Sequence, residues 1–424
     1  MGQETILIGL QLSGEGAQLT WHMAGMTEPQ TLRLPGETAD GMVEVPPQVW
    51  RQILAAPSPE QEEGGGTAGS RPLAPSGKGS RHGQLSEAAG FIKKLLNMVP
   101  RVREQGTRQV RVCVTVPSLT GQTGKNLFSI LRETGISEHC VCLQDYRTSF
   151  FYYVVNKKKE LWNGDVAFLM EKDGRMSGWI LHIDRSVSPW TASLHEEASQ
   201  DVSDRARGER EDGDWDRERD RLLYELLGKL FERRSVTASY LYGSYFSGSW
   251  AKRSFQYLTF HRHAFQGQNL FSKGACFGAM ARAGRISMPD ILFLGADMVA
   301  AGIGIHVRVR GRNQYLPLVR AGESWYEAHG ECEIVPEAEK NITVLSGIPG
   351  PGPEVNHVLR LDHFPDRPDR ATRLRLSVWF SSPAELVMEA EDLGFGSMYP
   401  ATGRVWRRKA VISGGGTPAE VPEK

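Results

Sequence analysis

The sequence has few cysteines, no excess of charge of either sign and no long apolar run. Its five cysteines form an odd set without paired spacing in a chain of 424 residues. This excludes a small disulfide-stapled module and favours a reducing compartment. Lys plus Arg and Asp plus Glu each number 50, which gives no reason to expect a nucleic-acid partner. Because no window approaches a membrane span and no signal-peptide pattern opens the chain, we expect a cytoplasmic protein without membrane contact.

Three stretches have too little apolar sequence to build a core. Residues 57–82 are dominated by Gly, Pro, Ser and Glu and predict a mobile loop. Residues 186–218 form a charged insertion, and 15 of the 21 residues from 201 to 221 are acidic or basic. We expect this insertion to be solvated or disordered. Residues 413–424 predict a disordered tail.

Residues 1–286 have the alternation of strands and helices that is typical of an α/β domain. Strand patterns at 6–10 and 110–116 and a helical pattern at 88–99 belong to its first part. A hairpin is predicted over 165–183, around an Asp-Gly pair that suits a turn with positive φ. The chain therefore begins with an α/β domain.

Residues 287–412 show a different periodicity. Apolar and polar residues alternate at 303–310 and again at 373–380, as they do in half-buried strands. No long helical pattern follows. We therefore expect a second, all-β sandwich domain without a helical lid.

Two motifs that often indicate a phosphate-binding loop or a metal site lack the spacing that such sites require. Residues 120–125 read Thr-Gly-Gln-Thr-Gly-Lys, but a Walker-type phosphate loop needs Gly where Leu119 stands and Ser or Thr where Asn126 stands. The histidine and two cysteines of residues 139–142 lack a second ligand pair with matching spacing. We expect no metal site from these residues.

Four segments are informative through their order. They are residues 8–14 on a predicted hairpin, 114–117 with 143–146, 165–181, and 238–244 with 273–275. This order resembles the first phosphate loop, the connecting strand, the second phosphate hairpin and the adenosine strand of DnaK-type heat-shock chaperones. The resemblance implies their two-lobed, actin-like (ribonuclease H-like) ATPase fold for residues 1–286. It also implies ATP or ADP with Mg²⁺ as cofactor.

The resemblance assigns site residues one by one. Asp145 matches an acid on the catalytic side of these ATPases. The residues matched to nucleotide binding lie on the first strand, on three turns and on one helix: Gly9, Gln11, Ser13, Gly14, Asp173, Gly174, Gly243, Ser244 and Lys273. Residues 374–378 and 386–394 are similar to the chaperones' substrate-binding sandwich, which implies a peptide or protein partner for the β domain.

A second resemblance covers most of the chain. Residues 250–251, 262–270 and 273–276 resemble an uncharacterised bacterial family that is known only as a domain of unknown function. This likeness is the more specific of the two. It implies no activity.

The likeness to the ATPases breaks down at the metal. In that fold, carboxylates in both phosphate loops hold Mg²⁺, which neutralises charge on the transferred phosphoryl group. Here Gln11 and Met170 stand at those positions, and neither brings a negative charge. Asp145 is the one acid retained. The sequence therefore leaves open whether the chain is an enzyme.

The leading hypothesis is a degenerate chaperone-like protein that binds nucleotide without efficient hydrolysis and binds a peptide or protein through its β domain. One alternative is a slow Mg²⁺-dependent ATPase in which Asp145 or Asp173 supplies the metal carboxylate. Another is a non-catalytic structural scaffold. The sequence names neither a partner nor an oligomeric state.

Overall fold

The computed structural model describes residues 5–55, 85–105, 109–208, 210–295, 298–336, 340–347 and 354–412. These residues form two compact units, and the main division falls between Ile291 and Leu292. The short segment Val187–Thr191 belongs with the second unit. The predicted loop at 57–82 and the predicted tail at 413–424 lie outside the described residues.

Unit 1 begins with a five-stranded sheet, which we call the first lobe together with its helices. Its strands are β1 (Ile6–Leu12), β2 (Ala17–His22), β3 (Gln30–Thr31), β4 (Val110–Val116) and β5 (Val141–Asp145). They stand in the order β3-β2-β1-β4-β5. The hairpin partner β2 is antiparallel to β1, whereas β4 is parallel to β1 and to β5.

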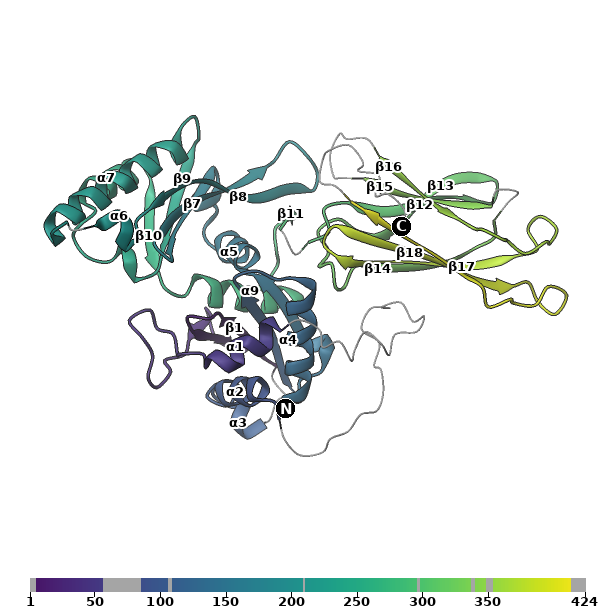
Figure 1. The fold of residues 1–424 in the computed structure, drawn as a ribbon, viewed down its shortest axis with the longest axis horizontal. Helices are drawn as coiled ribbons and strands as arrows, with labels where there is room; N and C mark the ends of the chain where they lie inside the picture. The colour runs from purple at the N-terminus through teal and green to yellow at the C-terminus, as the bar shows by residue number, and fades with distance from the viewer. Residues whose placement is uncertain are drawn as a thin grey trace. The chain divides into compact units, whose positions relative to one another are not determined.

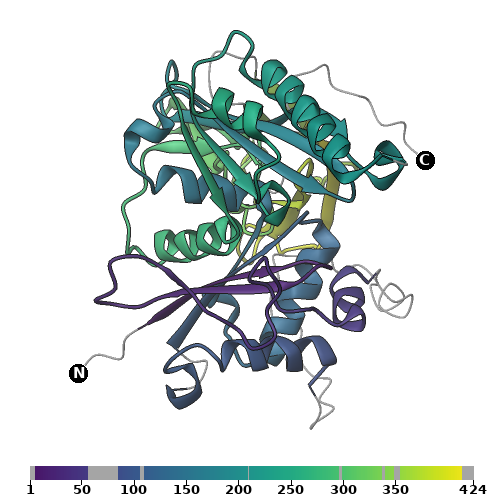
Figure 2. The same ribbon diagram turned by 90° about the vertical axis from the view of Figure 1, so that its left-hand side faces the viewer.

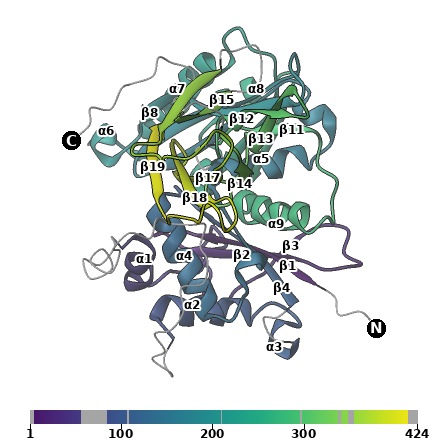
Figure 3. The ribbon, with the colours of Figure 1, turned by 90° about the vertical axis from the view of Figure 1, so that its right-hand side faces the viewer.

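Helices cover both faces of this sheet. One face carries α1 (Pro47–Leu54), α2 (Glu87–Leu96) and α4 (Gly121–Glu133), and the other carries α9 (Leu270–Arg282) (Figure 3). The apolar side of α2 is buried, and Ser86 caps the helix by accepting a hydrogen bond from the Ala89 amide. The shorter elements are α3 (Val102–Gln105) and the 3₁₀ turn η3 (Glu138–Cys140).

A second sheet repeats this plan and forms the second lobe (Figure 2). Its strands are β6 (Asp165–Lys172), β7 (Arg175–Asp184), β8 (Trp190–Asp201), β9 (Val236–Tyr242) and β10 (His263–Gly267). The order β8-β7-β6-β9-β10 matches that of the first sheet, again with an antiparallel hairpin and two parallel neighbours. A sixth strand, β11 (Ile291–Phe293), pairs with β8 at the edge. The predicted α/β class is confirmed, and five strands of the second sheet repeat the order of the first.

The remaining elements of unit 1 join and cover the second sheet. They are α5 (Tyr146–Val155), η4 (Lys159–Trp162), α6 (Asp204–Arg207), α7 (Asp212–Phe231), η5 (Ser244–Phe246) and α8 (Lys252–Thr259). Figure 1 shows α7 lying along this sheet. The short strand β11 (Ile291–Phe293) lies where the two units meet in the sequence.

The expected disorder of the charged insertion is wrong. Residues 190–201 form β8, and α7 begins at Asp212, well inside the charged stretch. Its charges pair along the helix surface, as in the Arg221 contacts with Glu218 and Glu225. The stretch is solvated, as predicted. It is nevertheless ordered, because α7 begins within it and buries leucines in the core in its last two turns. No helix among the described residues is both long and apolar enough to cross a membrane.

The prediction that the cysteines are unpaired is also wrong. Cys113 on β4 and Cys142 on β5 are direct partners in the parallel register and form a disulfide. The two residues lie 29 positions apart in sequence, so only the alignment of the strands reveals the pair. Cys140, Cys276 and Cys332 are free.

Unit 2 consists of two antiparallel four-stranded sheets (Figure 1). The first has the order β13-β12-β15-β16 and the second β14-β17-β18-β19. Alternate residues of both sheets enter one hydrophobic core, which confirms the predicted β domain. The strands are β12 (Gly302–Val309), β13 (Arg312–Val319), β14 (His329–Ile334), β15 (Asn341–Gly347), β16 (Val355–Arg360), β17 (Arg373–Ser382), β18 (Glu385–Gly394) and β19 (Val405–Val411).

Candidate functional site

The turn between β1 and β2 satisfies its own backbone groups. The Ser13 amide donates to the Gly16 carbonyl at 2.9 Å, and the Ser13 hydroxyl accepts from the amides of Glu15 and Gly16 at 3.2 Å each. A Cβ added to Gly14 would lie 3.1 Å from the Trp50 ring. The amides that would face a phosphate in the resembling ATPases are therefore partly engaged within the protein.

Gly9 lies within β1 and faces a helix. A Cβ built on Gly9 would lie 2.1 Å from the Ser272 carbonyl oxygen and 2.3 Å from the Cys276 amide nitrogen, both on α9. Only glycine permits this approach of helix to strand. The structure thus gives Gly9 a packing role, and its predicted contact with nucleotide stays a prediction.

Gln11 spans the two lobes. Its amide nitrogen donates to the Tyr242 hydroxyl of β9 at 2.7 Å and to the Tyr146 hydroxyl at 3.2 Å. Gln11 is 1 % exposed, and its side-chain oxygen has no hydrogen-bond partner among the described residues. Burial raises the pKa of both tyrosines, so the phenols stay neutral. The position at which a metal carboxylate would stand therefore holds three uncharged groups.

Backbone groups of the turn between β6 and β7 are also hydrogen-bonded to other groups of the protein. Asp173 and Gly174 both have positive φ, of 52° and 75°, which confirms the predicted Asp-Gly turn. The Gly174 amide donates to the Glu171 carboxylate at 2.8 Å, and its carbonyl accepts from the Val202 amide at 2.7 Å. Neighbouring Lys172 forms an ion pair of 3.5 Å with Glu15 of the first lobe. The two hairpin turns thus meet directly.

The turn after β9 holds a carboxylate of the protein. Asp40 of the first lobe accepts from the Ser244 amide at 2.7 Å and from the Ser244 hydroxyl at 3.1 Å. Gly243 has a φ of 97° and its carbonyl accepts from Gln266 at 3.2 Å. The amide that begins η5 is therefore already paired with an anion.

Asp145 caps α5. Its carboxylate accepts from the Thr148 amide at 2.7 Å, and the residue is 3 % exposed. Burial raises the pKa of this carboxyl, although the hydrogen bonds to Thr148 and the charge of Arg147 oppose the rise. Capping accounts for the residue type at this position. A catalytic role for Asp145 stays a prediction.

Lys273 is set apart from the turns. Its charge helps to lower the pKa of Lys157, which follows α5, although burial of Lys157 is the larger cause. Lys157 itself lies over the rings of Tyr153 and Phe277. The structure thus brings Gln11, Ser13, Gly14, Asp173 and Ser244 toward one region through lobe contacts, and it places Lys273 beside the far end of α5.

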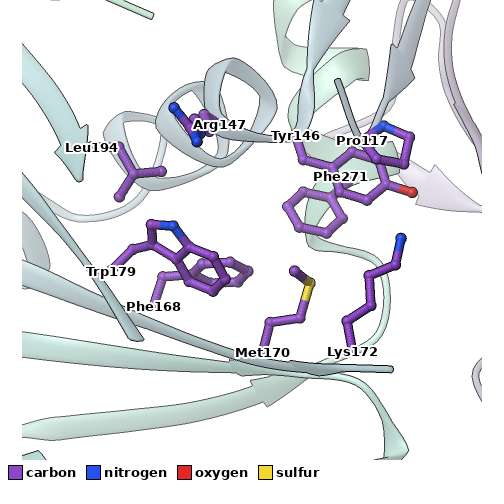
Figure 4. Close-up of a pocket in the computed structure, with 9 residues that line it drawn as sticks. All are labelled: Pro117, Tyr146, Arg147, Phe168, Met170, Lys172, Trp179, Leu194 and Phe271. Carbon is purple, nitrogen blue, oxygen red and sulfur yellow. The ribbon is translucent and has the colours of Figure 1, made fainter. Parts of the chain in front are cut away.

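A cavity of about 220 Å³ lies beside Tyr146 (Figure 4). Its apolar walls come from four strands or their ends and from α9: Pro117, Phe168, Met170, Trp179, Leu194 and Phe271. Its polar lining consists of Tyr146, Arg147 and Lys172. No acidic residue lines the cavity among the described residues.

Sequence reasoning missed this cavity. Phe168 and Trp179 read as ordinary strand residues, and alternation within a strand does not say which side chains leave a space between them. Leu194 fell in the predicted charged insertion. Of the lining, Met170 was singled out in the sequence for a different reason, and Pro117 and Tyr146 were named only within segments that resemble the ATPases. A cluster of aromatic residues shared among neighbouring elements was the one available signal.

Several solved structures are similar to this chain, at low sequence identity and low TM-score. A Ppx/GppA phosphatase from Aquifex aeolicus is 11% identical with a TM-score of 0.30, covering 56% of this chain and 67% of its own. A Bacteroides thetaiotaomicron protein with actin-like ATPase fold and unknown function is 9% identical with a TM-score of 0.31, covering 67% and 96%. A ROK hexokinase from Thermus thermophilus is 13% identical with a TM-score of 0.30, covering 66% and 99%. Similarity at this level does not establish the fold of this chain, which we assign from the strand order of its sheets.

Sequence families give the clearer result. Residues 298–412 match a domain of unknown function, DUF8552. No curated protein matches the chain. The reported matches name no DnaK-type chaperone, but the expected likeness to proteins without known activity is confirmed. Because residues 84–296, half of the 424 residues, match the C-terminal part of the family of unknown function DUF5716, the chain belongs to that family.

Proposed function

We propose that this chain is a two-lobed, actin-like protein that neither binds nor hydrolyses ATP with Mg²⁺ and acts as a non-catalytic binding protein. The repeated strand order of its two sheets supports the fold. The function is supported by the way the lobes contact each other. Protein side chains stand where nucleotide and metal would stand in the ATPases that the sequence resembles.

Three contacts between the lobes carry this proposal. Gln11 binds Tyr242, Glu15 pairs with Lys172, and Asp40 binds Ser244. Each joins a residue of the first lobe to one of the second, at or beside one of the predicted nucleotide turns. The Gln11 contact is the most informative of the three, because it is buried and excludes water.

Mg²⁺ does not fit these residues. A hard divalent cation requires oxygen ligands that carry charge, usually carboxylates. Gln11 itself contacts two neutral phenols and the Met42 sulfur at 3.6 Å. The carboxylates of Glu15 and Asp40 lie close enough to act on Tyr242, but they are paired with Lys172 and Ser244. The predicted acid Asp145 is buried as the cap of α5. We therefore derive no step through a metal.

Peptide capture by the β domain has weaker support. Strand addition needs an open edge, and the edge strand β19 carries Arg407, Arg408 and Lys409 in succession. Another edge strand, β13, contains Pro317, which cannot donate to a ladder. Charged and proline-bearing edges oppose strand pairing. We therefore do not propose the chaperone-like role for this chain.

The test is phosphate release from ATP with Mg²⁺, measured on the full chain and on Asp145→Asn. Asparagine keeps the cap of α5, so the variant should fold as the parent does. We expect both proteins to release phosphate no faster than buffer. Release by the parent that disappears in Asp145→Asn would overturn the proposal and support the slow ATPase.

A further inference from the structure

The cavity beside Tyr146 has walls that are already in place. Phe271 is 1 % exposed and stacks on Tyr146 with ring centroids 3.9 Å apart. Phe168 is 4 % exposed and lies 5.4 Å from the Trp179 ring and 5.7 Å from that of Phe271. Packing on several sides holds these rings, so a ligand would enter a preformed space.

The rings of this lining suit a flat apolar ligand. Figure 4 shows Trp179 and Phe168 on one side of the space, Phe271 and Tyr146 on another, and Met170 between them. Aromatic rings favour offset stacking or edge contacts with another ring. The Met170 thioether also makes favourable contacts with aromatic rings.

The charges of the lining favour an anion. The Arg147 side chain is exposed and forms no ion pair within the described part of the chain, although its charge and its backbone amide help to lower the pKa of neighbouring Asp145. Lys172 also lines the cavity, but it is paired with Glu15 at 3.5 Å, so of the two lining cations Arg147 is the one open to a ligand. Asp145, the acid next to Arg147, is buried and occupied in capping α5. A carboxylate at the rim would therefore find a guanidinium that pairs well with it.

The size of the cavity excludes larger ligands. At about 220 Å³ it is below the roughly 300–1,000 Å³ of pockets for drug-sized molecules. A free sugar is a poor match, because most of the lining offers no hydrogen-bond partner for its hydroxyl groups. One ring with a short acidic arm fits both the volume and the lining.

We propose that this cavity binds a small aromatic carboxylate, with its ring against Trp179 and Phe271 and its carboxylate at Arg147. Tyr146 lines this site, and its hydroxyl accepts from Gln11, which does not line it. Binding here does not depend on whether ATP binds elsewhere.

The test uses phenylacetate as the probe and 2-phenylethanol as its neutral partner. Each is titrated into the full chain by calorimetry, with ligand-observed NMR to detect weak binding. We expect saturable binding of phenylacetate and at least roughly tenfold weaker binding of the alcohol, since a charge-assisted contact is lost. No saturable binding of phenylacetate, or equal binding of the two probes, would overturn the proposal.

Two variants locate the binding. Leu194→Trp fills the cavity and should abolish phenylacetate binding, whereas Arg147→Gln should weaken it roughly tenfold. Arg132→Gln is the matched control, because Arg132 is exposed near the end of α4 and does not line the cavity. Arg147→Gln replaces an exposed side chain, so it remains informative if Leu194→Trp fails to fold. Binding unchanged in Arg147→Gln, or reduced equally in Arg132→Gln, would contradict the assignment. Displacement of phenylacetate by ATP would also contradict it.

Discussion

At the scale of residues, glycines set how closely α9 packs on its neighbours. Gly9 faces the α9 backbone, and a Cβ on Gly274 would lie 1.8 Å from the Ser149 carbonyl oxygen of α5. A Cβ on Gly278 would lie 2.2 Å from the Gln144 side-chain nitrogen. The obstacles at Gly9 and Gly274 are backbone atoms, which cannot swing aside as the end of a side chain can. These two positions therefore tolerate no side chain without movement of α9.

We expect Gly9→Ala to destabilise the chain by about 1–3 kcal/mol or more, because the added methyl group overpacks a fixed interface. Gly90→Ala is the control, since a Cβ there meets nothing within 4 Å in the helix α2. It should stabilise by roughly 0.5–1 kcal/mol. Urea unfolding of unit 1, followed by circular dichroism, measures both. A loss at Gly9 no larger than about 0.5 kcal/mol would show that α9 can move away.

A buried ion pair gives unit 2 a pH dependence. Arg367 donates to both carboxylate oxygens of Asp392 at 2.8 and 2.9 Å, and Asp392 also accepts from the amides of Gly394 and Thr402. Burial alone would raise the pKa of Asp392, but Arg367 and the other donors outweigh it and lower the pKa well below its usual range.

A lowered carboxyl pKa stabilises the folded state above the unfolded pKa of about 3.9 and loses that effect as the pH falls below it. Asp392→Asn should cost about 3–5 kcal/mol at pH 7, because it leaves Arg367 buried without its counter-ion. The difference between the two proteins should shrink between about pH 4 and pH 2. Urea unfolding across this range measures it, and a difference independent of pH would refute the role of the charge.

At the scale of elements, α7 shows why a charged sequence can still be a helix. Arg217, Arg219 and Arg221 each pair with an acid three positions earlier on the helix surface. Such exposed pairs contribute little individually. The second half of the helix buries four leucines against the sheet, and Gly178 of β7 lies beneath Leu230.

We therefore expect the core side of α7, and not its charges, to determine its stability. Leu230→Ala should destabilise by about 2–5 kcal/mol, because it leaves a cavity beside a close packing contact. Arg217→Ala should change stability by no more than about 0.5 kcal/mol. Thermal unfolding compares the two variants. Similar losses of stability in both would show that the ion pairs stabilise the helix as much as its buried leucines do.

The individual helices and strands could be predicted from the sequence better than the contacts between them. Alternating or continuous apolar patterns located β1, β4 and β9, and the Asp-Gly pair located the β6–β7 turn. The start of α7 was missed because periodic burial begins only near Leu223, while the first turns are held by that later packing. The Cys113–Cys142 pair and the Gln11–Tyr242 contact join distant strands, so no local pattern could predict them.

At the scale of the whole molecule, the described residues form two compact units. In unit 1, two sheets that share the order of five strands contact each other through side chains at each predicted nucleotide turn. In unit 2, two sheets close over a single core, and charged residues or proline mark two of their edges. A binding protein without ATP turnover agrees with both descriptions.

The most direct measurement is a calorimetric titration of the full chain with ATP in the presence of Mg²⁺, alongside Tyr242→Phe. The account predicts no saturable heat from the parent, because Gln11, Lys172 and Ser244 are already paired with protein groups. Tyr242→Phe, which removes the Gln11 partner, should likewise give none, since no metal ligand is gained. Saturable one-site binding of ATP by the parent would contradict the account.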